Sequence, residues 1–234
     1  MEAKNSGQLT VAGTRGFLPV WLAWVTVGET LGFLVPILTH LTASLFVPDF
    51  IFPLLVGAGA VEGAVLGWAQ AHVLRPRPPD LSGRRWMILT SLGAAAAWVI
   101  GMLPSAAAAV WERWPAPVQV LAGALAALAL LGSVGAAQSL ELRRHFRRSR
   151  PWILGNGAAW GAGLLIFLAI STPLWQPGQP PAVIALIGVA AGIGMAAGMA
   201  AISGLVMERL VDRRLRGTTE ADPLSVARNP LTSR

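Results

Sequence analysis

The sequence predicts an all-α integral membrane protein, a bundle of about six transmembrane helices. Of its 234 residues, 54% are hydrophobic and only 12% are charged, whereas a soluble domain carries about 25% charged residues. The apolar residues form runs of roughly 20 or more, the length that crosses a hydrocarbon core about 30 Å thick. Basic residues cluster in every second connection between these runs. Together these features indicate a multi-pass protein.

The first apolar run follows a polar segment, residues 1–16. This run is too long for the apolar region of a cleavable signal peptide and has no convincing cleavage site, so we expect a span that also directs insertion. The tail, 210–234, has little to bury and is expected to be flexible. The predicted spans, which form a bundle over 17–209, are 17–44, 51–74, 86–111, 117–142, 152–173 and 182–207.

Basic residues define the expected orientation. They cluster at 75–85, 143–150 and 209–216, and all but one of the 18 Lys and Arg residues lie on that side of the predicted spans. Cytoplasmic loops carry an excess of Lys and Arg, so both termini are predicted to be cytoplasmic. This placement accounts for the net charge of +7 without nucleic acid, which we do not expect as a partner.

No enzyme template fits the chain. P-loop, G-x-S-x-G and H-E-x-x-H patterns are absent from the sequence, so we expect no catalytic residues, cofactor or enzyme activity. Cysteine is absent, which excludes disulfides and thiolate metal sites. His40, His72 and His145 are scattered along the chain and do not predict a metal site. Ligation of a tetrapyrrole by His40 or His72 stays a minor alternative.

Most tryptophans are predicted at the ends of spans, where an amphipathic ring suits the headgroup region. Three others, Trp68, Trp98 and Trp160, lie deeper, and anchoring at the interface does not explain them. The expected anchors are Trp21, Trp24, Trp86 and Trp152 near the cytoplasmic ends, and Trp111, Trp114 and Trp175 near the outer ends.

Spans two and four end alike, which indicates an internal repeat. Each matching end is followed by a basic loop and then by a span that opens with Trp86 or Trp152. The sixth span is also glycine-rich and ends in a basic cluster, but it has no glutamine at the matching depth. We expect three two-helix units in one orientation, the third degenerate. The matching elements are Gly67-x-x-Gln70-x-x-x-Leu74-Arg75 and Gly135-x-x-Gln138-x-x-x-Leu142-Arg143.

This pattern resembles a family of uncharacterised bacterial membrane proteins with a repeated G-x-x-Q-x-x-x-L-R element followed by a helix that opens with tryptophan. The resemblance covers roughly residues 60–210 and is partial, because the third unit lacks the glutamine. It implies a bacterial inner-membrane protein and says nothing about an activity.

Small residues and glutamine share one helix face in the repeated element. Glycine lets another helix backbone approach closely, and a glutamine at such a contact can hydrogen bond across it. We therefore favour a packing role for Gln70 and Gln138, with a shared solute path as the alternative. The glycines predicted at helix contacts are Gly59, Gly63, Gly67 and Gly135.

Two carboxyl groups are predicted at mid-membrane depth, Glu29 in the first span and Glu62 in the second. A charge there costs at least ~2.5–3.5 kcal/mol, so such residues normally face the bundle interior. Antiparallel neighbours could bring the carboxyls together to share a proton. The functional interpretation is a proton- or cation-coupled site, and Gly28, Gly32 and Pro36 would allow local unwinding. The structural interpretation is two protonated acids, each bonded to a threonine, a backbone carbonyl or a glutamine, and the lack of a basic residue at that depth favours it.

Two classes of function therefore stay open. The favoured one is a small-solute or ion transporter, channel or solute-binding membrane component, with Glu29 and Glu62 at the site and Gln70 and Gln138 nearer the cytoplasmic mouth. The alternative is a non-catalytic accessory or assembly subunit of a larger membrane complex. Expected partners are the bilayer, a second copy or complex subunits, and anionic lipids at Arg144, Arg147 and Arg148.

Overall fold

The computed structural model describes residues 16–75, 80–146 and 149–220, with side chains up to residue 213. Within these ranges every regular element is a helix, and six helices are long and apolar enough to cross a membrane. The chain is a multi-pass membrane protein, and the predicted fold class is confirmed. The long helices are α2 (Phe17–Phe46), α3 (Ile51–Leu74), α4 (Gly83–Ala106), α6 (Ala116–Leu142), α7 (Arg150–Leu174) and α8 (Pro181–Glu220).

Two boundaries differ from the prediction by more than three residues. The third span, predicted to continue to residue 111, ends at Ala106 two residues after Pro104, and the short helix α5 (Ala108–Trp111) follows the break. At the other end of the chain, α8 continues as a helix to Glu220, into the segment predicted as a tail. Residues 1–15 and 221–234 lie outside the described residues.

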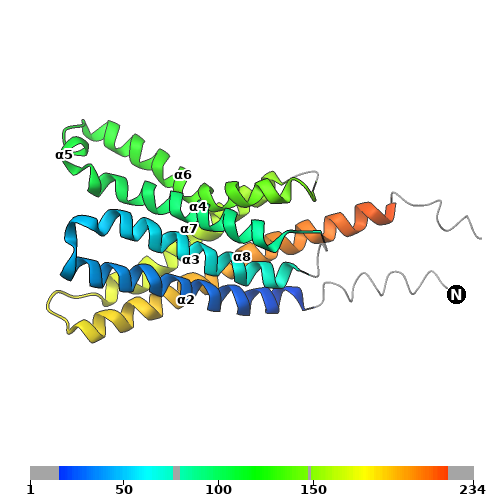
Figure 1. Cartoon of the computed structure of the whole chain (residues 1–234), viewed down its shortest axis with the longest axis horizontal. Coiled ribbons are helices and arrows are strands. Elements are labelled where there is room, and N and C mark those ends of the chain that lie inside the picture. Colours follow the sequence, from blue (N-terminus) through cyan, green and yellow to red (C-terminus); the bar gives the residue numbers. More distant parts are fainter. Residues whose placement is uncertain (1–15, 76–79, 147–148, 221–234) are drawn as a thin grey trace, which may run out of the picture.

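Each long helix packs against the next one along the chain, and α8 packs against α2, so the six helices close into a ring. Figure 1 shows the start of α2 and the connections α3–α4 and α6–α7 at one end of the bundle. We call this the basic end, because the arginine clusters flank these connections. The connections α2–α3, α4–α6 and α7–α8 lie at the opposite end (Figure 1). A three-residue helix, η1 (Pro48–Phe50), joins α2 to α3.

Glycines bring the helices together. A Cβ atom at Gly63 would lie 2.5 Å from that of Ala94, and one at Gly67 would lie 2.8 Å from that of Thr90, so α3 and α4 meet almost backbone to backbone. Such close approach strengthens packing where lipid provides no hydrophobic driving force between helices. The predicted packing glycines that lie at such contacts are Gly59, Gly63 and Gly67 against α4, and Gly135 against α7.

Burial differs between the two ends of the bundle. The large, fully buried side chains include Trp21, Leu74, Trp86 and Trp152, which lie toward the basic end. Toward the opposite end, most residues in the last turns of α2, α4 and α7 are exposed. Exposed leucines such as Leu165 suit a surface that faces lipid tails.

Candidate functional site

Three tryptophans form a layer across the bundle near its basic end. Trp21, Trp86 and Trp152 lie in the first two turns of α2, α4 and α7, and none of the three is exposed. Their predicted role as headgroup anchors is therefore wrong. Each indole N–H donates to a side chain on a neighbouring helix, and this acceptor draws the ring inward. The three bonds are Trp86 to Gln70 Oε1 at 3.0 Å, Trp152 to Gln138 Oε1 at 2.9 Å and Trp21 to Ser203 Oγ at 3.2 Å.

Ser203 supplies the missing member of the repeat. The stretch Ala200-x-x-Ser203-x-x-x-Met207 of α8 takes the place that Gly-x-x-Gln-x-x-x-Leu has in the other two units. Its bond from Trp21 joins α8 to α2 and so closes the ring. The bundle thus repeats three times, and each unit's second helix accepts from the tryptophan that opens the next unit. The sequence did not reveal this third element because serine replaces glutamine.

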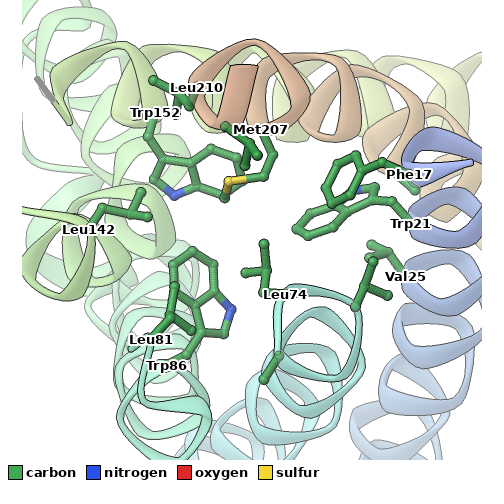
Figure 2. Packing of buried hydrophobic residues seen from close by; sticks show 14 of the residues in the cluster. Phe17, Trp21, Val25, Leu74, Leu81, Trp86, Leu142, Trp152, Met207 and Leu210 are labelled. Atoms are coloured by element: carbon green, nitrogen blue, oxygen red, sulfur yellow. The ribbon is translucent and has the colours of Figure 1, made fainter. Parts of the chain in front are cut away.

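The tryptophan layer is filled rather than open. Gln138 Nε2 donates to Gln70 Oε1 at 2.7 Å and to Thr90 Oγ1 at 2.8 Å, so both glutamines are held inside the layer. Figure 2 shows Leu74, Met207 and further apolar side chains between the indole rings. The layer separates the basic end from the space beyond it. In this structure the two glutamines bond to each other and to tryptophan rather than lining that space.

Beyond this layer, toward the opposite end, all six long helices line a partly open cavity of about 350 Å³. The repeat continues into its lining. The residues eight after each tryptophan and eight before each acceptor all lie on the cavity wall. They are Glu29 and Glu62 from the first unit, Ala94 and Leu130 from the second, and Trp160 and Met195 from the third.

The structure brings the two carboxyl groups together. Glu29 is fully buried, Glu62 is 5% exposed, and their carboxyls lie within hydrogen-bonding reach of each other once one of them holds a proton. This approach is possible because Gly32 packs against the backbone of Glu62, where a Cβ atom would lie 3.0 Å from the carbonyl oxygen. The predicted meeting of two antiparallel acids thus has a simple cause, a glycine at the α2–α3 contact.

The two acids have unequal surroundings. Glu62 Oε2 accepts the indole N–H of Trp98 at 2.8 Å. Both oxygens of Glu29 are buried, and within the described part of the chain no N–H or O–H group donates to them apart from a protonated Glu62. Among the described residues, neither acid bonds to a threonine, a backbone carbonyl or a glutamine, the partners that a structural role was expected to provide. The pair therefore depends on a shared proton or on an incoming group.

The rest of the lining is apolar and aromatic. Phe33, Trp98 and Trp160 contribute rings, and Trp160 Nε1 is buried without a partner among the described residues. The lining contains no Lys, Arg or His in the described ranges. The sequence indicated Trp98 and Trp160 only through their depth, which interface anchoring could not explain.

A third buried carboxyl group, that of Glu141, lies at the basic end. It accepts the backbone N–H of Ser82 at 3.1 Å, and Arg85 Nε lies 3.1 Å from its other oxygen. This contact ties the end of α6 to the start of α4. Arg144 lies 4.0 Å from Glu141 and is largely exposed, whereas 147–148, with the other two arginines predicted to contact lipid, lie outside the described residues.

No protein-family model matches this chain, and neither does a curated protein or a solved structure. The resemblance drawn from the repeated glutamine element therefore rests on that motif alone. The fold and the site define a multi-pass membrane protein with an acidic pair in an internal cavity.

Proposed function

We propose that this protein is a non-enzymatic solute-binding or transport protein, whose cavity takes up a small solute under the control of protonation at Glu29 and Glu62. One observation carries the proposal. At the layer where the first unit has two carboxyl groups, the second unit has Ala94 and Leu130, and the third has Trp160 and Met195. Two of the three units therefore form this part of the ring with apolar or aromatic side chains, so the fold itself does not require carboxyl groups there.

A structural role would not offset the free energy needed to place two carboxyl groups inside the membrane. Each charge at the bilayer centre costs at least ~2.5–3.5 kcal/mol on insertion scales. Within the described residues the pair receives one indole hydrogen bond, at Glu62, in return. Ionisable residues inside a membrane mark substrate or ion pathways and proton relays more often than packing contacts. The difference between the first unit and the other two therefore supports a site for binding and coupling.

The position of the cavity supports transport. The tryptophan layer separates it from the basic end, whereas at the opposite end most residues in the last turns of α2, α4 and α7 are exposed. A central site closed on one side is what one state of an alternating-access carrier presents. In this proposal the tryptophan layer is the closed side.

Carbodiimide labelling tests the proposal without a known solute, because the reagent prefers protonated carboxyls in apolar surroundings. We expect mass spectrometry to find modification at Glu29 or Glu62 that falls as the pH rises through neutrality. Glu29→Gln and Glu62→Gln should remove their own adducts, and Glu141→Gln should leave those adducts unchanged. Absence of labelling at both acids from mildly acidic to mildly alkaline pH would contradict a titrating site and favour an accessory subunit.

We also propose that the protein lies in a bacterial inner membrane with both termini in the cytoplasm. The arginine clusters that flank the α3–α4 and α6–α7 connections share one end of the bundle with the start of α2 (Figure 1), and an excess of basic residues is typical of the cytoplasmic side. Reporter fusions after residues 80, 147 and 216 should therefore report cytoplasm, and fusions near 48, 114 and 177 the exterior. An exterior signal at residue 147 would overturn the orientation.

A further inference from the structure

We propose that the cavity binds an organic cation, an ammonium group on a small apolar body, in exchange for a proton of the pair formed by Glu29 and Glu62. This inference rests on the proposed function and names the chemical class of its solute. It is carried by the charge, the aromatic rings and the size of the cavity.

Within the described part of the chain, Glu29 and Glu62 are the two ionisable residues that line the cavity. Among the described lining residues, α4, α6, α7 and α8 contribute no titratable side chain; they add only apolar residues, Trp98 and Trp160. An ionised carboxylate away from water needs a compensating charge. No lining residue supplies one within the described ranges, so the compensating charge must be a proton or must arrive with the solute.

The donor set favours an organic cation over a metal ion. Hard cations such as Ca²⁺ take six to eight oxygen ligands. The polar side chains in the described lining are two carboxyls and two indoles, and an indole N–H is a donor that cannot ligate a metal. A quaternary or protonated amine needs no such oxygen shell, because apolar and aromatic groups can surround it.

Aromatic rings stand beside the acids. Trp98 is held from two sides, since its N–H donates to Glu62 and its ring rests on Gly59, where any Cβ atom would overlap it. Phe33 and Trp160 line the same cavity. The faces of tryptophan and phenylalanine attract cations, and clusters of aromatic rings are a known means of recognising quaternary ammonium groups. A fixed ring next to a carboxylate is therefore suited to such a group.

The cavity size limits the solute. A volume of about 350 Å³ lies at the low end of the range of about 300–1,000 Å³ found for small-molecule sites. The remaining wall is apolar and includes Leu66, Val134 and Leu164. A solute with one small ring or a short branched chain beside its ammonium group matches this wall.

Charge balance gives the coupling. With two protons the pair is neutral. Loss of one proton leaves a charge of minus one, which the arriving cation neutralises while the second proton stays shared between Glu29 and Glu62. One proton therefore leaves for each cation that binds, and the buried site is neutral before and after the exchange.

The test uses the full-length protein in mild detergent and two probes of the same shape. Benzyltrimethylammonium carries a permanent charge, and neopentylbenzene replaces its nitrogen with carbon. We expect the ammonium probe to bind in equilibrium dialysis and to protect Glu29 and Glu62 from carbodiimide, while neopentylbenzene does neither. The affinity of the ammonium probe should fall about tenfold for each unit by which the pH is lowered while the acid pair is fully protonated, because one proton competes with one cation.

Variants locate the binding. Glu29→Gln, Glu62→Gln and Trp98→Leu should each weaken binding of the ammonium probe by about tenfold or more. Glu141→Gln is the matched control, since it makes the same change at a buried carboxyl outside the cavity and should leave the affinity unchanged. If a variant fails to fold, the probe pair and the release of one proton per bound cation on the unaltered protein decide the question.

The outcomes separate the inference from the proposed function. If Glu29 or Glu62 is labelled in a pH-dependent manner and the ammonium probe neither binds nor protects, the proposal of a cationic solute is wrong. The proposal of a titrating site would then still hold. Equal protection by neopentylbenzene would also contradict a cationic solute, because binding would then not depend on charge. If neither acid labels at any pH, both the site and its cation fall together.

Discussion

The tryptophan layer and the cavity layer lie only eight residues apart along each helix, about 12 Å at 1.5 Å per residue, yet they treat the three units differently. In the tryptophan layer every unit contributes an indole and an acceptor. In the cavity layer the first unit alone contributes carboxyls. Where the repeat is kept, packing and hydrogen bonds explain the residues. Where the repeat is broken, packing does not explain the two carboxyl groups, whereas a binding site does.

The two layers also differ in how completely they are filled. Indole rings, leucines and Met207 occupy the centre of the first (Figure 2), whereas the second leaves about 350 Å³ open. Substitutions in the tryptophan layer should therefore act on stability, and substitutions in the cavity layer on binding. The predictions below test that division.

The largest loss of stability is expected for Gly63→Ile, because Gly63, although it lines the cavity, lies where α3 and α4 meet almost backbone to backbone. Its Cβ would lie 2.5 Å from that of Ala94, and overpacking of this kind costs about 1–3 kcal/mol. Gly57→Ile on the same helix is the control, since nothing lies within 4 Å of its Cβ position. Thermal melting in detergent should show a clear drop for the first variant and little change for the second. Unchanged melting of Gly63→Ile would show that this face meets lipid.

A smaller loss is expected in the tryptophan layer, and it should be graded. Trp152→Phe leaves Gln138 Oε1 buried without its indole donor, whereas after Trp86→Phe the acceptor Gln70 Oε1 keeps the amide of Gln138. A hydrogen bond between helices in lipid contributes about 0.6–2 kcal/mol, and this is the loss expected where no other donor reaches the acceptor. Melting temperatures should therefore fall more for Trp152→Phe. Equal effects would mean that lost ring volume, common to both variants, dominates.

The cavity layer should tolerate the loss of its charge. Glutamine keeps the shape of a protonated glutamate and most of its hydrogen bonding, so Glu29→Gln and Glu62→Gln should melt close to the unaltered protein. Loss of binding with retained stability is the signature of a site. A fall in melting temperature as large as that of Gly63→Ile would show instead that the acids hold the bundle together.

The smallest effect is expected at the surface of the basic end. A basic residue near an anionic membrane contributes about 1 kcal/mol to lipid attraction, so changing Arg144, Arg147 and Arg148 to Gln should reduce the anionic lipid that co-purifies. Arg113→Gln changes the one Lys or Arg residue predicted on the opposite side and should leave that lipid unchanged. Equal lipid content in all the proteins would limit the cluster to a role in orientation.

Sequence reasoning reached the spans, the repeat and the acid pair, because each leaves a trace in composition or spacing. Glu29 and Glu62 were noticed because a carboxyl amid apolar residues is costly wherever it faces. The burial of Trp21, Trp86 and Trp152 was missed because a tryptophan near a span end suits lipid headgroups and a bundle interior equally well. Ser203 was missed because a serine hydroxyl can accept the indole hydrogen bond as a glutamine does. The contact is therefore kept although the residue type differs and the sequence motif is lost.

The sequence by itself determined that the chain is a helical membrane protein with six spans, and it predicted which end is cytoplasmic. The length of apolar runs and the distribution of charge suffice for this, because they are local properties that act directly on insertion into the bilayer. Only the tertiary structure decided that α8 meets α2 to close a ring, that Trp98 bonds to Glu62, and that residues of three units share one cavity wall. These contacts join segments far apart in the chain. They depend on where glycines such as Gly32 and Gly59 let helices and rings approach, which no local pattern records.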